Sequence, residues 1–209
     1  MAIFKPAKGS GGSFFGILPA ALIDIVDRSD DKKDDGTKRF NWADIYLDVE
    51  FEPKGSQYTR KMQIAGSFER DSNGKITGGS VLNRMYSFFD AIGFAGGVNL
   101  DGEWEDKDGN KIDDIEQVLK DYCMENPIVT NDSEYKYLIY VYKEQPRNGS
   151  DKVWTRVSNS IFLNKPGEQD KFSERINFLK SRNIIKEYNG VTKETGKFTE
   201  LSNAGIEAL

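Results

Sequence analysis

The chain has 209 residues and a net charge of −5, and 25 of its residues are aromatic (13 Phe, 9 Tyr and 3 Trp). A chain of this length forms one domain with additions, and its aromatic content is sufficient for a hydrophobic core. It has no histidine and a single cysteine, which excludes histidine-dependent catalysis, imidazole metal sites, an intrachain disulfide and zinc sites with two or more cysteines. This composition favours a binding module over an enzyme.

The first 19 residues predict a flexible, basic leader, because residues 5–13 are rich in glycine, serine and lysine. The longest early apolar run, residues 14–26, is interrupted by Gly16, Pro19 and Asp24. It is shorter than the ~18–20 residues of a membrane span. It also lacks a convincing signal-peptide cleavage pattern. We therefore expect a cytoplasmic protein that does not enter a membrane.

Three strands are predicted next, at residues 21–28, 40–51 and 58–68. The second shows the clearest alternation, with Ile45, Leu47 and Val49 on one face and polar or aromatic side chains on the other. A helix is expected from Val81 to Ile92, with Ser80 as its N-cap and Gly93 at its end, and a shorter helix at about 113–122.

The second half of the chain predicts two further strands, at 135–143 and 153–163, joined by a loop around an Asn-Gly turn, and then a helix to about residue 183. Three strands, a helix and two strands are the plan of an OB-fold barrel. We therefore expect a mainly β protein with helices, built as an OB-fold-like five-stranded barrel. The leader would occupy 1–19, the barrel domain 20–164 with an acidic insertion at 101–134, and a helical extension 165–209.

Acidic residues are concentrated in one segment of the chain. Residues 101–134 contain 12 acidic residues and 3 lysines, whereas the rest of the chain has 26 basic and 22 acidic residues. The local field at a groove matters more to a polyanion than the total charge does. The net charge therefore does not exclude a nucleic-acid partner for the more basic remainder.

Aromatic and basic residues alternate with apolar ones on several predicted strands. If Ile139 and Val141 face the core, Tyr140 and Tyr142 face outward beside basic residues. Exposed aromatic rings stack on bases at ~1–3 kcal/mol each, and neighbouring cations pair with phosphates. The candidate DNA-binding residues are Arg39, Trp42, Tyr46, Lys61, Tyr140, Tyr142, Lys143, Arg147, Lys152, Trp154 and Arg156.

Other chemistry is less well supported. Residues 101–114 fail the EF-hand spacing, because neither alignment supplies both an acid at position 1 and a glycine at position 6. Cys123 has no basic neighbour that would activate it. We expect no metal, no cofactor and no catalytic residue. Two alternatives stay open: a protein–protein interaction module, and a metal-dependent nuclease that uses Asp101, Asp106, Asp108 or Asp113.

The order of elements resembles that of phage-encoded single-stranded-DNA-binding proteins with an OB fold. The resemblance rests on residues 40–51, on the helix that ends Asp-Ala-Ile-Gly-Phe at 90–94, and on residues 137–163. It covers about residues 20–164. It implies sequence-independent binding of single-stranded DNA in phage replication or recombination, in the host bacterial cytoplasm, with replication or recombination proteins as partners. The chain departs from the family in having no acidic run at its C-terminus.

Overall fold

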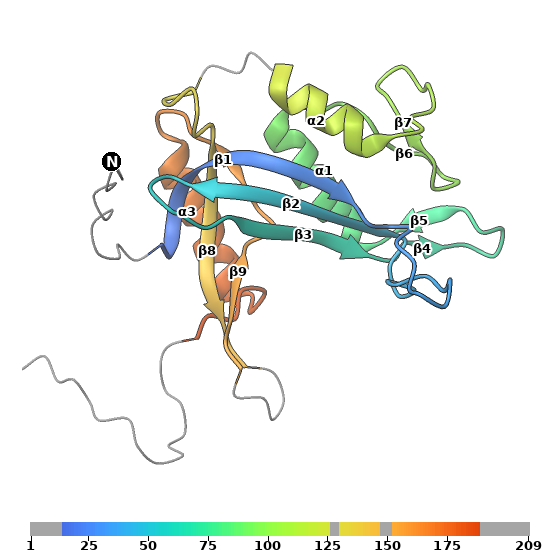
Figure 1. The fold of residues 1–209 in the computed structure, drawn as a ribbon, viewed down its shortest axis with the longest axis horizontal. Coiled ribbons are helices and arrows are strands. Elements are labelled where there is room, and N and C mark those ends of the chain that lie inside the picture. Colours follow the sequence, from blue (N-terminus) through green and yellow to red (C-terminus); the bar gives the residue numbers. More distant parts are fainter. Residues whose placement is uncertain (1–13, 126–129, 147–151, 189–209) are drawn as a thin grey trace, which may run out of the picture.

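The computed structural model describes residues 14–125, 130–146 and 152–188. Its centre is a six-stranded antiparallel sheet (Figure 1). The strands are β1 (Gly16–Asp27), β2 (Ile45–Pro53), β3 (Arg60–Gly66), β8 (Tyr137–Glu144), β9 (Trp154–Val157) and β10 (Phe162–Leu163). Two small hairpins lie outside the sheet, β4 (Glu69–Arg70) with β5 (Ile76–Gly78) and β6 (Gly97–Val98) with β7 (Trp104–Glu105).

Strand β1 pairs with a different strand along each of its two halves. The half from Ala20 to Asp27 pairs with β2, while the half from Gly16 to Ala20 pairs with β8. A register shift between Leu22 and Asp24 marks a β-bulge, which bends a strand and increases its twist. As a result the β8–β9 ribbon crosses β2 and β3 steeply in Figure 1. It brings β9 within 8 Å of β3, Cα to Cα, without a ladder between them.

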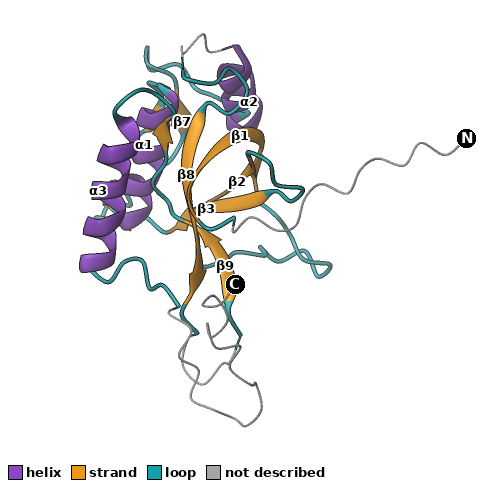
Figure 2. Ribbon diagram, turned by 90° about the vertical axis from the view of Figure 1, so that its left-hand side faces the viewer, coloured by secondary structure: helices purple, strands orange, loops and turns teal. Residues whose placement is uncertain are grey.

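The three helices are α1 (Ser80–Ile92), α2 (Ile115–Glu125) and α3 (Glu168–Ser181). Figure 2 shows α1 and α3 on one side of the strands and α2 at one end. Helix α1 buries Met85, Phe88, Phe89 and Ile92, and it ends at Gly93, whose left-handed backbone (φ 79°) suits glycine. Its N-cap is Gly79 rather than Ser80, so the predicted start is wrong by one residue.

The main core lies between the sheet, α1 and α2. It contains the alternating residues of β2 together with Ile139 and Val141 of β8. Leu119 of α2 is fully buried there, so the acidic segment 101–134 is anchored in the core and is not only a solvated insertion. A second core lies on the opposite face of β8, where α3 covers Tyr140 and Tyr142.

The expected mainly β architecture with helices is confirmed, but the sheet of the described residues is not a closed five-stranded barrel. The predicted strand 153–163 is divided into β9 and β10, which both pair with β8. Four residues, 158–161, separate them, whereas two separate their partners on β8, so the interruption is a bulge. Residues 16–19, assigned to the leader from the sequence, are part of β1.

Burial of α2 predicts a stability effect. Leu119→Ala removes a fully buried side chain and leaves a cavity, so the free energy of unfolding should fall by about 2–5 kcal/mol in a urea titration. Leu100→Ala, an exposed leucine just before the acidic segment, should change it by less than about 0.5 kcal/mol. Equal effects of the two substitutions would contradict the packing of α2 on the sheet.

Candidate nucleic-acid interface

A groove of about 810 Å³ lies where β9 approaches β3. One wall is formed by the sheet, through Lys61, Gln63 and Ala65 of β3 and Arg156 of β9. The other is formed by helices α1 and α3. The bulge after β9 contributes residues 158–160 to the lining. The groove therefore exists because the sheet curls without closing.

The groove is positively charged although the protein is acidic. Among the residues that the structure describes, its lining contains four cations, Lys61, Arg84, Arg156 and Arg175, and one carboxylate, Glu144. The lining thus has a formal charge of +3, in a chain whose net charge is −5. A concave surface lined mainly by positive charges concentrates the electrostatic field and attracts an anionic ligand.

The four cations differ in how they are compensated. On the sheet wall, the Lys61 ammonium lies 3.6 Å from a Glu50 carboxylate oxygen, and Arg156 Nε lies 2.9 Å from Glu144 Oε2. On the helical wall, Arg84 donates to the carbonyl oxygen and hydroxyl of Ser80, at 3.3 and 3.1 Å. The Arg175 guanidinium lies 5.6 Å from the Phe178 ring centroid.

No carboxylate lies within ion-pair distance of Arg84 or Arg175 among residues 14–125, 130–146 and 152–188. Burial lowers the pKa of the Arg84 guanidinium from its ordinary value. Because arginine still stays charged at any physiological pH, α1 brings an uncompensated and partly desolvated cation to the groove.

An exposed tryptophan borders the sheet wall. Trp42 has 57% of its surface exposed and lies edge-on to Tyr46, with ring centroids 6.0 Å apart. Tyr46 in turn stacks on Phe40 at 3.9 Å. These contacts hold the indole while leaving much of its surface open to a stacking partner.

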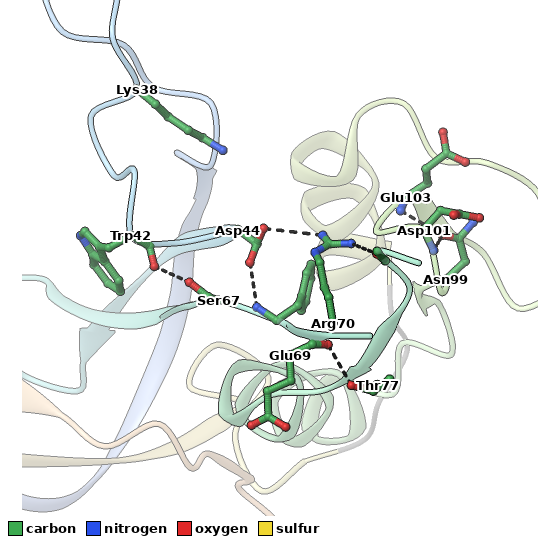
Figure 3. A network of polar contacts seen from close by, with 12 residues as sticks. Lys38, Trp42, Asp44, Ser67, Glu69, Arg70, Thr77, Asn99, Asp101 and Glu103 are labelled. Atoms are coloured by element: carbon green, nitrogen blue, oxygen red, sulfur yellow. Dashed lines mark hydrogen bonds and ion pairs between the residues drawn. The ribbon is translucent and has the colours of Figure 1, made fainter. Parts of the chain in front are cut away.

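The loop that carries Trp42 is tied to the segment after β3 (Figure 3). The Ser67 hydroxyl donates to the Trp42 carbonyl oxygen, and the Phe68 amide donates to Asp44 at 2.7 Å. The second Asp44 oxygen lies 3.6 Å from the Arg70 guanidinium. In Figure 3 the indole points away from this network. The backbone around Trp42 is thus positioned by polar contacts, while its side chain stays available.

The structure brings together four of the predicted residues: the groove lining includes Trp42, Lys61, Tyr142 and Arg156. Trp154 is 49% exposed on the same face as Arg156 but is not part of the lining, and Lys152 Nζ lies 4.0 Å from its ring centroid. The others are scattered: Lys143 projects from the other face of β8 over Phe15, Arg39 is exposed in the loop before β2, and Arg147 lies outside the described residues.

The expected exposure of three tyrosines is wrong. Tyr140 and Tyr142 do lie opposite Ile139 and Val141, but α3 packs on them, and Tyr140 is only 5% exposed. Tyr46 is buried beneath Phe40. Alternation identifies the faces of a strand, but it does not reveal whether a helix from elsewhere covers the outer one.

Tyr140 has a structural role instead. Its hydroxyl donates to Glu187 Oε1 at 2.8 Å, and Lys180 Nζ lies 2.7 Å from Glu187 Oε2. Burial alone would raise the pKa of Glu187, but the hydrogen bonds from Lys180 and Tyr140 outweigh it and hold the pKa below its ordinary value. These contacts attach the segment after α3 to β8.

Sequence reasoning missed Arg84 and Arg175. Arg84 is the only basic residue between Ser80 and Ile92 and lies off the apolar face of the helix, which is a detectable signal. Arg175 has no such signal, because α3 also contains Lys171 and Lys180. Only the packing of α1 and α3 around the sheet brings the two arginines to one groove.

The four acids of the nuclease alternative do not form a metal site in the structure. Among the described residues no group of three or more potential ligands could hold a metal ion. Asp101 lies 2.5 Å from Lys75 Nζ, and Asp106 accepts hydrogen bonds from the 108 and 110 amides of its own turn. A separate pocket of about 640 Å³ is lined by seven carboxylates and one arginine, which makes it repulsive to a nucleic acid.

Comparison of the chain with protein-family models, curated proteins and solved structures gave no match. Within the part of the chain that the structure describes, no helix has the length and apolar character needed to cross a membrane.

The hydrogen bond of the buried Tyr140 side chain predicts a stability effect. Tyr140→Phe removes the hydrogen bond to Glu187 but keeps the ring, so the free energy of unfolding should fall by about 1 kcal/mol. Tyr58→Phe, at an exposed position, should leave it unchanged. Thermal melts at pH 7 measure both. An unaltered melt for Tyr140→Phe would contradict the attachment of the segment after α3.

Proposed function

We propose that this protein binds single-stranded DNA, without sequence preference and without catalysis, in the groove between β3 and β9. The observation that carries the proposal is a groove lining of charge +3 beside the exposed ring of Trp42. Cations pair with phosphates, and an aromatic ring stacks on any base. A role in phage replication or recombination follows from the resemblance of the sequence to that family.

We further propose that the fold is an OB barrel whose last seam is open. The strand order β3-β2-β1-β8-β9 and the position of α1 between β3 and β8 support this assignment. So does the approach of β9 to β3. An OB fold is a partly open five-stranded barrel that binds oligonucleotides on its strand face and loops. The groove along β3 and β9 occupies such a position.

Single strands suit this site better than duplexes do. Stacking on Trp42 requires a base with an accessible face, and bases in a duplex are already stacked on each other. The second, acidic pocket repels phosphates and so limits the binding of extended duplexes to the groove side.

The first binding prediction concerns the tryptophan. Trp42→Ala should weaken the binding of a (dT)20 oligonucleotide by about 1–3 kcal/mol, the value of one stacked base. Fluorescence anisotropy of a labelled oligonucleotide at low salt measures this effect. Tyr58→Ala, an exposed aromatic outside the groove lining, should bind like the wild type. Cleavage of the oligonucleotide with Mg²⁺ would favour a nuclease, and no affinity at all would favour a protein–protein module.

The second binding prediction concerns Glu144, the carboxylate in the described groove lining. Glu144→Gln removes a negative charge from the lining and releases Arg156 from its 2.9 Å ion pair. Affinity for (dT)20 should therefore rise several-fold, and the gain should shrink as salt screens the field. Glu168→Gln, at the start of α3 and outside the groove lining, is the matched control and should change nothing. Weaker binding by Glu144→Gln would show that the ion pair positions Arg156 productively.

A further inference from the structure

We infer that the sugar–phosphate backbone of the bound strand runs along the helical wall of the groove, held by Arg84 of α1 and Arg175 of α3. The bases then face the sheet wall and Trp42. This inference rests on the proposed function and adds the orientation of the ligand. It differs from the expectation from sequence, which assigned phosphate contacts to basic residues of the strands and of the loops between them.

The first argument is the state of the cations on the two walls. Lys61 and Arg156 on the sheet wall each lie beside a carboxylate of the protein. A phosphate at these positions would meet the repulsion of Glu50 or Glu144 as well as the attraction of the cation. Arg84 and Arg175 have no carboxylate within ion-pair distance among the described residues, so the uncompensated charge of the groove lies on the helices.

The second argument is the position of Arg84. A side chain at Gly66 of β3 would meet Val81 at 3.1 Å and the Arg84 guanidinium at 3.2 Å. Glycine at this position therefore lets α1 lie directly against the strand and keeps the guanidinium at the groove. Among the described residues Arg84 hydrogen-bonds to the neutral oxygens of Ser80 alone, which leaves several of its five N–H donors for a ligand.

The third argument is the chemistry of the two walls. Besides its arginines, the helical wall contributes Ser80, Asn83 and Ser87, and hydroxyl and amide side chains are common donors to phosphate oxygens. The large aromatic surface of the lining, Trp42, belongs to the loop that leads into β2. A DNA strand whose phosphates lie against the helices and whose bases lie towards the sheet would place each chemical group beside the side chains that bind it.

The test is the salt dependence of (dT)20 binding. Each phosphate contact on a single strand contributes about −0.7 to the slope of log K against log salt. Arg84→Gln and Arg175→Gln should each make the slope shallower by about 0.7, and the double variant by about 1.4. Arg84→Lys keeps the charge and should keep most of the slope. Lys171→Gln is the matched control and should keep the whole salt slope. Lys171 is on the same helix as Arg175 but lies outside the groove lining, and it pairs with Glu168 at 2.7 Å.

The controls separate the two proposals. If wild-type protein does not bind (dT)20, the proposed function fails, and this inference fails with it. The other outcome is that the wild type binds, that Arg84→Gln and Arg175→Gln keep the wild-type salt slope, and that Lys61→Gln and Arg156→Gln reduce it. The DNA backbone would then run along the sheet wall, and only this inference would be wrong. Circular dichroism melts identify any variant that does not fold; should Arg84→Gln be one, Arg84→Lys and Arg175→Gln decide the result.

Discussion

The pairing of β1 with two strands along its two halves is the constraint on which the rest of the structure depends. Residues 16–20 pair with β8 and residues 20–27 with β2, so the two ladders meet at Ala20, and the bulge between Leu22 and Asp24 adds twist to the same strand. Strand β9, which pairs with β8, thereby comes close to β3. The seam where they meet without a ladder is the groove, so the candidate site is a direct consequence of the bend in one strand.

The two faces of β8 then determine what surrounds the groove. Ile139 and Val141 enter the main core with α1, while Tyr140 and Tyr142 form a second core with α3. The two faces of one strand thus contribute to the packing of two different helices, and both helices contribute arginines to the groove lining. Burial of Tyr140 removes a stacking surface but fixes the wall from which Arg175 extends.

Charge is separated within one acidic molecule. The groove lining carries +3, whereas the second pocket has seven carboxylates and one arginine. Salt screens exposed charges from one another beyond about 10 Å at 0.1 M, so a polyanion near the groove responds mainly to the local cations. Net charge describes the solubility of such a protein better than it describes its ligand.

The sequence by itself determined the identity of most elements and the faces of the strands. The register of β9 on β8 confirms that Trp154 and Arg156 share a face with Tyr142, as alternation predicts, because side-chain direction along a strand is a local property with a period of two. The tertiary structure alone decided which faces are covered, that the sheet stays open, and that Arg84 and Arg175 meet at one groove. These features depend on contacts between segments far apart in the chain, and no local pattern records which surfaces will meet.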